Sequence, residues 1–485
     1  MSGVDEHGTG AVRTVVAGGR VVVPDTGPVD VDIVVERGLV SELRPHGHSA
    51  NPSGAAGGDD VVDARGLVVL PGLVNAHTHS YGQLARAPFA DSWLEPWMPR
   101  AMAAWRGAAP DAFGLAATLT AADALRRGIT TVVDHATLAP AALDAVIEAY
   151  DRSGLRVMLA LQVSDLPFDR WVPSDLAGSG LVDRLAAADP FGARDAEELL
   201  ELVDSAVERL ADHPRISVLV GPAAPERCSD RLLDGLASQV ARHDLPVHTH
   251  LLEVPSQRIW GDLVGRLSDH DLLGPTTTVA HAVHVDAHDV ARLARAGAGV
   301  VLNPISNAAL GCRSTAPLLE LRRAGVELGA GTDGFNCGGG QDLLGSARVA
   351  MVMDRGRSVP DEWLAPRDAW RLATDGLASP LGRPGLGRIE PGAPADLLLV
   401  DPDDAGWLQL DDPTTEAVLG GFGGGLRRVL IGGAPVEPID VRHAMAAARA
   451  AASDLRRSNA SFAAGLQDEL VPALAELCRG SAALL

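Results

Sequence analysis

Apolar runs of strand length recur along the middle of the chain and alternate with longer stretches rich in Ala, Leu, Arg and Glu. The short runs predict strands, and the longer stretches predict helices. Strands that alternate with helices favour parallel βαβ units, and eight of them indicate a (β/α)₈ TIM barrel. The eight expected strands are Leu73–His77, Thr130–Asp134, Arg156–Val163, Ile216–Val220, Pro246–His250, Thr277–His281, Gly299–Asn303 and Val326–Ala330.

Both ends of the chain follow a different pattern, in which short β-rich runs alternate with turns at Gly, Pro and Asp. This pattern covers residues 11–70 and returns after about residue 385. We infer that the two ends build one small β-domain in a protein of the α/β class. The expected organisation is the first part of the β-domain at 1–70, the barrel at 71–385, the second part of the β-domain at 386–440 and C-terminal helices at 441–485.

Two histidines stand at the end of the first barrel strand. Pro71 and Gly72 separate two short apolar runs, and the second of these runs leads into His77 and His79. Residues i and i+2 of a strand point to the same face, so the two imidazoles can converge on one metal ion. A His-x-His pair alone is a weak signal for a metal site.

Three later stretches strengthen this signal, because each ends or follows an apolar run that predicts a strand. They are His248–Glu253, Ala280–His284 and Gly331–Gly334. The active site of a (β/α)₈ barrel lies at the C-terminal ends of its strands. The histidines and carboxylates of these stretches are therefore expected to meet at one end of the barrel.

Composition narrows the range of partners and compartments. The 485 residues are 46% hydrophobic, which is enough for a sizeable core, and the net charge of −22 argues against nucleic acid or an anionic membrane as a partner. No apolar run approaches the roughly 20 residues of a membrane span, and the start lacks the pattern of a signal peptide. None of the four cysteines forms a C-x-x-C pair. We expect a cytoplasmic protein that acts on a small molecule, and a homo-oligomer is left open.

The chain contains no lysine, and all 41 basic residues are arginine. A compositional bias of the source genome accounts for this absence. Its chemical consequence is that no lysine can serve as a Schiff-base nucleophile or, once carboxylated, as a bridge between two metal ions.

The motifs together resemble those of the amidohydrolase superfamily, and more narrowly the branch that holds S-adenosylhomocysteine deaminase, guanine deaminase and the s-triazine hydrolases. This resemblance implies a distorted (β/α)₈ barrel with a small β-sandwich domain. The matching stretches, which span Pro71 to about Asp401, are Pro71–His79, His250–Glu253, Ala280–His284, Asn303–Asn307, Gly331–Gly334 and Gly387–Asp396.

The resemblance implies that His77, His79, His250 and Asp333 hold a divalent metal ion. Three neutral imidazoles and one carboxylate suit Zn²⁺, and less exclusively Fe²⁺. Such an ion lowers the pKa of a water molecule, and Asp333 could accept the proton of that water. Two-metal members of the family commonly use a carboxylated lysine, so the absence of lysine favours one metal ion per chain.

Two further catalytic residues follow from the same pattern. Glu253 would be the proton shuttle that protonates a ring nitrogen and then the leaving group. The alternative is a carboxylate on a surface loop. His281 would hydrogen-bond the attacking water or the developing oxyanion.

Candidates for substrate contact are weaker. His135 and His284 follow strands two and six, and each could equally be a structural histidine; His248 is expected in a supporting role. Asn303 and Asn307 are expected to hold the loop after strand seven rather than to bind substrate. The residues that we expect to line the pocket are Gln83, Trp93, His135, His284 and Asn336.

One stretch departs from the family pattern. Nucleoside-type deaminases of this branch often carry a substrate-contacting histidine in a Gly-Pro-His motif after the fourth strand. Here the stretch reads Gly221-Pro222-Ala223, and the loop Phe335–Gly340 also differs from the usual polar run. Adenosine-like substrates are therefore in doubt.

We expect a zinc-dependent hydrolase that acts on carbon–nitrogen bonds other than peptide bonds. As an aminohydrolase (deaminase), it would replace an amino group on a C=N carbon of a nitrogen heterocycle or amidine and release ammonia. One alternative is the removal of another leaving group, such as chloride, an alkylamine or an amide. The other is a non-catalytic binding protein with a relict metal site.

Overall fold

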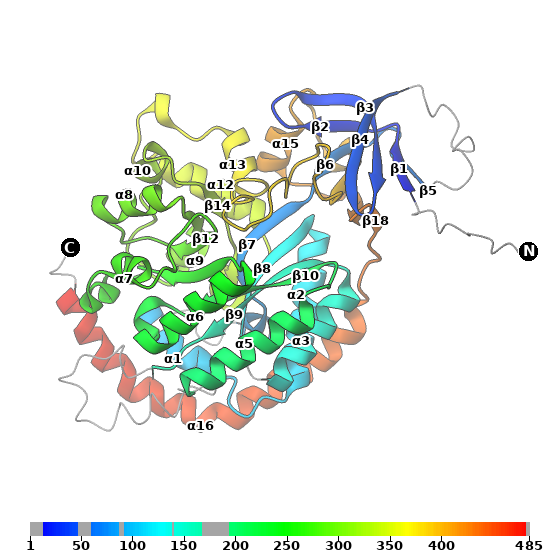
Figure 1. Ribbon diagram of the computed structural model, residues 1–485. Helices are drawn as coiled ribbons and strands as arrows, with labels where there is room; N and C mark the ends of the chain where they lie inside the picture. Colours follow the sequence, from blue (N-terminus) through cyan, green and yellow to red (C-terminus); the bar gives the residue numbers. More distant parts are fainter. Residues whose placement is uncertain (1–12, 47–59, 87–91, 138–139, 167–193, 482–485) are drawn as a thin grey trace, which may run out of the picture. The chain divides into compact units, whose positions relative to one another are not determined.

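The computed structural model describes residues 13–46, 60–86, 92–137, 140–166 and 194–481. The chain divides into two compact units (Figure 1). One consists of Met1–Gly72 with Gly385–Glu437, and the other of Leu73–Pro384 with Pro438–Leu485.

The first unit is a mixed β-sheet built from both parts of the sequence. Its strand β3 (Gly27–Glu36) is shared between two halves: residues 27–30 pair with β2 (Arg20–Val23), whereas residues 31–36 pair with β4 (Leu39–Pro45). A buried core that includes Val16, Ile33 and Leu399 lies inside. The other strands are β1 (Arg13–Ala17), β5 (Asp60–Asp63), β6 (Val68–Pro71), β16 (Leu397–Val400), β17 (Leu426–Ile431) and β18 (Ala434–Pro435), with short helices α14 (Pro402–Ala405) and α15 (Pro413–Gly420).

The second unit is a parallel barrel in which all eight predicted strands have a counterpart. The strands follow one another around the sheet in chain order, and almost every residue in them is buried, as expected for parallel strands covered on both faces. They are β7 (Leu73–His79), β8 (Ile129–Thr137), β9 (Arg156–Val163), β10 (Ile216–Pro222), β11 (Val247–Leu251), β12 (Thr277–His281), β13 (Gly299–Leu302), β14 (Leu328–Ala330) and β15 (Asp333–Gly334).

The last barrel strand is split, and the split closes the barrel. β14 pairs with β13, whereas β15 pairs with β7, the first strand of the unit. Only residues 331–332 separate β14 from β15. The two ends of the sheet are therefore consecutive in the sequence, which confirms the expected distorted (β/α)₈ barrel.

Helices surround the barrel strands (Figure 1). Local sequence sets their ends: in α8, Asp286 accepts from the N–H groups of His288 and Asp289, and Gly297 ends the helix at φ 71°. The helices used below are α1 (Leu94–Ala103), α2 (Pro110–Arg126), α6 (Asp230–His243), α8 (Ala287–Ala296), α9 (Pro304–Ala309), α10 (Leu318–Arg323) and α12 (Leu343–Asp354), with the 3₁₀ turns η4 (Pro225–Arg227) and η5 (Pro255–Trp260).

The C-terminal segment of the chain forms a single helix, α16 (Val441–Ser481), rather than the several helices expected. It packs against α1 and α2 of the same unit (Figure 1). None of the described helices combines the length and apolar character that crossing a bilayer requires.

Candidate active site

His77 and His79 lie at the end of β7, and both side chains are buried. The Nδ1 atom of His77 lies 2.8 Å from Nε2 of His248, whose Nδ1 lies 2.8 Å from the hydroxyl of Thr278. That hydroxyl donates to the carbonyl of Val247 and so accepts from His248. The proton positions that satisfy this chain put a hydrogen on Nδ1 of His77 and leave its Nε2 with a free lone pair.

His79 and His250 are oriented by backbone carbonyls. Nδ1 of His79 lies 3.0 Å from the carbonyl oxygen of His135, and Nδ1 of His250 lies 2.7 Å from that of Ala223. A carbonyl can only accept, so both Nδ1 atoms carry the hydrogen. The Nε2 atoms of both rings therefore present lone pairs.

These lone pairs converge with a carboxylate. The Nε2 atoms of His79 and His250 are 3.1 Å apart, and Oδ1 of Asp333 lies 3.4 Å from Nε2 of His79 and 3.5 Å from Nε2 of His77. Nε2 of His77 is buried without a hydrogen-bond partner. Lone pairs at these distances repel unless a cation lies between them. The donor set is the one that Zn²⁺ takes in catalytic sites, so the residues fit a divalent metal ion.

Asp333 stands directly after the split in the last strand, in a left-handed backbone conformation with φ 59°. The hydroxyl of Ser306 donates to its Oδ2, and the N–H of Gly334 donates to its Oδ1. Gly331 permits the close approach of β7, because a Cβ atom there would lie 2.9 Å from Cβ of His77. The strained backbone is a feature often found at functional sites.

Burial sets the charge state of the cluster. Desolvation, with the neighbouring His77, lowers the pKa of His79 to about 4. The pKa of His250 lies well below its ordinary value for the same leading reason, burial. Burial opposes the ionisation of Asp333, but the surrounding imidazoles, His77 foremost, hold the pKa of this carboxyl well below its ordinary value. Neutral imidazoles around an ionised carboxylate are the protonation states that a metal ion requires.

Glu253 lies two residues beyond β11 and is buried. Desolvation, and then the charge of Asp333, raise its pKa well above the ordinary value. The thiol of Cys312 lies 3.7 Å from Oε1 of Glu253, and Nδ1 of His281 lies 3.4 Å from the same oxygen. A carboxyl group whose pKa is raised in this way is better suited to proton donation than an ordinary glutamate side chain.

A buried glutamine holds the backbone of Glu253 in place. Oε1 of Gln257 accepts from the N–H of Glu253 at 2.6 Å and from the N–H of Val254 at 3.1 Å. Its Nε2 donates to Oε1 of Glu226 at 2.7 Å. Leu252, just before Glu253, has a left-handed φ of 47°. Both ends of the Gln257 amide therefore serve to fix a strained turn.

His281 ends β12 and faces the same cluster, with φ 74°. The amide nitrogen of Asn307 lies 2.9 Å from its Nδ1 and donates to it, which puts the ring hydrogen on Nε2. That Nε2 is buried without a hydrogen-bond partner, 3.9 Å from Oδ2 of Asp333. His281 therefore offers an N–H donor to the site rather than a lone pair.

The candidates for substrate contact lie at different depths. His135 is fully buried with its ring stacked on that of His250, and one of its ring nitrogens lies within 4.8 Å of ring nitrogens of His77, His79 and His250. His284 is half-buried, and its Nε2 lies 2.8 Å from the carbonyl oxygen of Cys312. The structure thus brings His135 into the cluster and holds His284 beside Cys312.

Gln83, Trp93 and Asn336 are less closely tied to the cluster. Gln83 is buried in the 3₁₀ turn after β7, where its Oε1 accepts from Arg86 and its Nε2 is unpaired. Both polar atoms of Asn336 are buried and unpaired. Trp93 is half-buried and precedes the first turn of α1.

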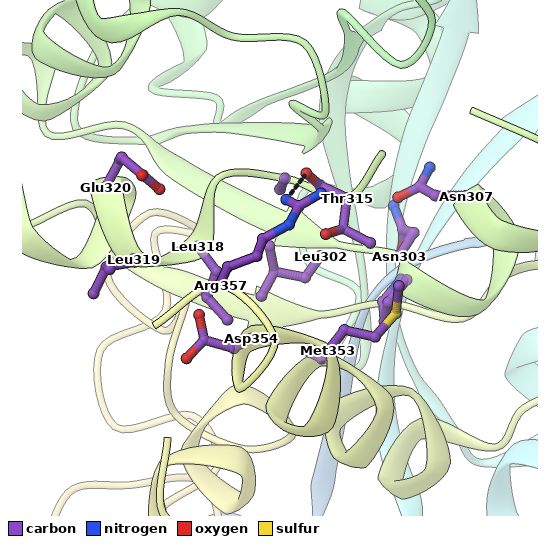
Figure 2. A pocket seen from close by; sticks show the side chains of 13 residues that line it. Leu302, Asn303, Asn307, Thr315, Leu318, Leu319, Glu320, Met353, Asp354 and Arg357 are labelled. Atoms are coloured by element: carbon purple, nitrogen blue, oxygen red, sulfur yellow. Dashed lines mark hydrogen bonds between the residues drawn. The ribbon is translucent and has the colours of Figure 1, made fainter. Parts of the chain in front are cut away.

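Figure 2 shows a separate pocket of about 450 Å³, solvent-open space included. One of its lining residues, Asn307, contacts His281. Asn303 and Asn307 border it on one side, and Asp354 and Arg357 lie on another, with Arg357 donating to the carbonyl of Thr315 at 3.1 Å. None of the clustered histidines lines this pocket. It lies among α9, α10 and α12, apart from the converging lone pairs.

Sequence reasoning missed several residues that support the site. Ser306 hydrogen-bonds Asp333, and Asn307 hydrogen-bonds His281. Gln257 hydrogen-bonds the backbone of Glu253. The sequence predicts that Asn303 and Asn307 hold the loop after strand seven, and the position of this stretch after a barrel strand is the signal that could assign it to the site. Gln257 lies four residues beyond Glu253 in the same loop but carries no motif of its own.

Comparisons with known proteins agree on one family. The model of the Amidohydrolase family matches residues 68–436. An 8-oxoguanine deaminase of Pseudomonas aeruginosa is 32% identical over 443 residues, which cover 87% of this chain and 94% of the relative. A 5-methylthioadenosine/S-adenosylhomocysteine deaminase of Symbiobacterium thermophilum is 31% identical over 411 residues, covering 80% and 85%. A structure of atrazine chlorohydrolase from Arthrobacter aurescens TC1 with zinc aligns at a TM-score of 0.78 with 24% identity, covering 90% of this chain and 100% of that one.

Proposed function

Because the chain belongs to the amidohydrolase family, we propose that it is a zinc-dependent aminohydrolase that replaces an amino group on a C=N carbon of a nitrogen heterocycle with oxygen and releases ammonia. The observation that carries this proposal is the convergence of three Nε2 lone pairs and the Asp333 carboxylate beside Glu253, whose pKa burial raises well above its ordinary value. A binding protein would have no use for a buried acid next to a metal site.

The metal site consists of His77, His79, His250 and Asp333. A Zn²⁺ ion bound there would make hydroxide available near neutral pH and polarise the substrate. One ion per chain is expected, because the two groups of candidate ligands among the described residues share His77 and no lysine is present to bridge a second ion.

Proton transfers fall to the carboxyl groups. Glu253 donates its proton to a ring nitrogen as oxygen is added to the neighbouring carbon. It then takes the proton of the added hydroxyl group and passes it to the departing amino group, which leaves as ammonia. The proton that Asp333 takes from the water restores Glu253 for the next turnover. Asp333 accepts the proton of the attacking water. The Nε2–H group of His281 donates to the added oxygen as negative charge develops on it, and Asn307 keeps that N–H pointed into the site.

The substrate that the site favours is a free oxopurine base rather than a nucleoside. Ala223 follows β10 on the catalytic face, where its carbonyl orients His250 and its side chain offers no hydrogen-bonding group. The relative from P. aeruginosa bears the name 8-oxoguanine deaminase, which supports a base of this kind. A cytoplasmic location, and association into a homo-oligomer, stay predictions from the sequence.

Ammonia release from zinc-loaded protein tests the proposal. The substrates to compare are 8-oxoguanine, guanine, adenosine and S-adenosylhomocysteine, with kcat/KM as the measure. We expect a free base to exceed both nucleosides. If either nucleoside were the best substrate, the inference from Ala223 that the site favours a free base would be wrong. If no member of the panel released ammonia while a chlorinated or alkylaminated triazine was hydrolysed, the deaminase proposal would fail.

A further inference from the structure

Glu95 is a buried carboxylate that the chemistry described so far does not use. It lies in the first turn of α1, with only 6% of its surface exposed. The N–H of Leu94 donates to the carbonyl of Leu310 at 3.1 Å, which docks the start of α1 on the end of α9. That contact lies two residues from Cys312, the residue whose thiol approaches Glu253.

Contacts with the loop after β11 place Glu95 near the proton shuttle. The hydroxyl of Ser256 donates to Oε1 of Glu95 at 3.1 Å, and Ser256 lies three residues beyond Glu253. The negative charge of Glu95 also helps to raise the pKa values of Glu253 and Cys312. Three elements that border the site, α1, α9 and the loop after β11, thus meet around this carboxylate.

The carboxylate is poorly satisfied by the protein itself. Within the described part of the chain, Ser256 is the only hydrogen-bond partner of Glu95, and no arginine or histidine lies within ion-pair distance. That bond goes to Oε1, and Oε2 of Glu95 has no hydrogen-bond partner among the described residues. An ionised carboxylate can only accept hydrogen bonds. A buried charge of this kind gains most from a ligand that donates to it.

We propose that Glu95 is a specificity-determining residue that accepts a hydrogen bond from a ring N–H of the heterocyclic substrate. The proposal rests on the proposed deaminase function and names the feature of the substrate that the site reads. Glu253 then moves protons at the reacting carbon, whereas Glu95 accepts a hydrogen bond from an N–H group at another edge of the same ring. A heterocycle without a donor at that edge would leave the Glu95 charge unpaired.

The test couples a change in the protein to a change in the ligand. Zinc-loaded wild type, Glu95→Gln and Ser256→Ala are compared on 8-oxoguanine and on analogues in which one ring N–H at a time is methylated. We expect Glu95→Gln to lower kcat/KM for the parent base by about tenfold to a hundredfold, the usual worth of a hydrogen bond to a charged group. One methylated analogue should be poor with wild type and fall no further in Glu95→Gln, because the bond is already lost.

Ser256→Ala is the matched control, since it cuts the tether between α1 and the loop and keeps the carboxylate. It should lower kcat/KM by one common factor for all analogues. If Glu95→Gln behaved in the same way, Glu95 would be a tether and the proposal would be wrong.

Binding separates this inference from the proposed reaction. Calorimetric affinities of the same bases for zinc-loaded Glu253→Gln, with and without Glu95→Gln, require no turnover. An affinity loss that disappears with one methylated analogue supports the Glu95 contact even if no ammonia is ever released. Equal affinities in both variants for every base would contradict it.

Discussion

Nε2 of His248 lies 2.8 Å from Nδ1 of His77, so one buried imidazole orients another that we assign to the metal ion. The pair is completed by the hydroxyl of Thr278, 2.8 Å from Nδ1 of His248. Groups that hydrogen-bond a metal-ligating histidine usually contribute about 10-fold to 100-fold to metal affinity or activity.

Replacing His248 should weaken metal binding without removing a ligand. In His248→Leu, the ring of His77 loses its partner and its fixed tautomer, so we expect zinc affinity to fall by about 10-fold to 100-fold. Competition with a chromophoric chelator measures this affinity. His288→Leu, at an exposed position in α8, is the control and should leave affinity unchanged. Unaltered zinc affinity in His248→Leu would exclude an orienting role.

Metal content should be about one divalent ion per chain, as expected for a catalytic site of this donor set. Elemental analysis of the purified protein measures the stoichiometry. Dialysis against a chelator should abolish ammonia release, and added Zn²⁺ should restore it. Two stoichiometric ions per chain would contradict the single-ion site.

Glu253→Gln should retain the metal and lose turnover. The amide keeps the shape of the side chain but cannot exchange protons, so kcat should fall by roughly 10²-fold to 10⁴-fold. Glu327→Gln, just before β14 at the opposite end of the barrel, is the matched control and should keep normal kcat. Near-normal turnover in Glu253→Gln would remove this residue from the mechanism.

The same carboxyl should make the metal-free protein less stable as the pH rises. Burial, and then Asp333, raise the pKa of Glu253 well above its ordinary value of 4.5. Below pH 4.5 both the folded and the unfolded state hold the proton of Glu253, and its contribution to the free energy of unfolding is fully present. As the pH rises, Glu253 ionises first in the unfolded state, so the free energy of unfolding falls. The fall ends when the pH passes the pKa of Glu253 in the folded protein.

Chemical denaturation of metal-free wild type and Glu253→Gln at several pH values isolates this effect. The free energy of unfolding of the variant should exceed that of wild type by an amount that grows with pH above 4.5 and then levels off. A difference that is independent of pH would show that Glu253 has an ordinary pKa in the folded protein.

Gln257→Met should reduce kcat more than its effect on folding explains. Loss of the amide leaves the N–H groups of Glu253 and Val254 unpaired and frees Glu226, at a cost of about 1–3 kcal/mol in the free energy of unfolding for each buried group left unsatisfied. Gln239→Met in α6 breaks a comparable buried bond to the carbonyl of Leu200, away from the cluster. The control should lose stability and keep kcat; equal kcat values in both variants would refute a positioning role for Gln257.

Much of the barrel and of its chemistry could be predicted from the sequence. Parallel strands are buried on both faces, so each appears as an apolar run, and the metal-binding types of residue stand at the ends of those runs. The fold class and the expected class of hydrolase are confirmed, and His77, His79, His250 and Asp333 do lie together. Their metal-binding role stays a prediction.

Contacts between loops could not be predicted. Glu95, Gln257 and Asn307 act through side chains that meet only after α1, α9 and the loop after β11 have packed, and no spacing in the sequence records such a meeting. The last strand shows the same limit. Its expected span began at Val326, whereas β14 begins at Leu328 and the strand resumes at Asp333 after a break that hydrophobic periodicity does not reveal.

The split between β14 and β15 also orders events in folding. His250 comes from β11, whereas β15 carries Asp333 to β7, which carries His77 and His79, so the other three ligands come from the first and the last strand of the barrel. More than 250 residues separate them in the sequence, and contacts of such long range form late. The full ligand set cannot exist until the seam between these strands has closed. A metal ion bound there would link β7 to β15 across the seam. A chain that has lost its ion should therefore open at this seam before it opens anywhere else in the barrel.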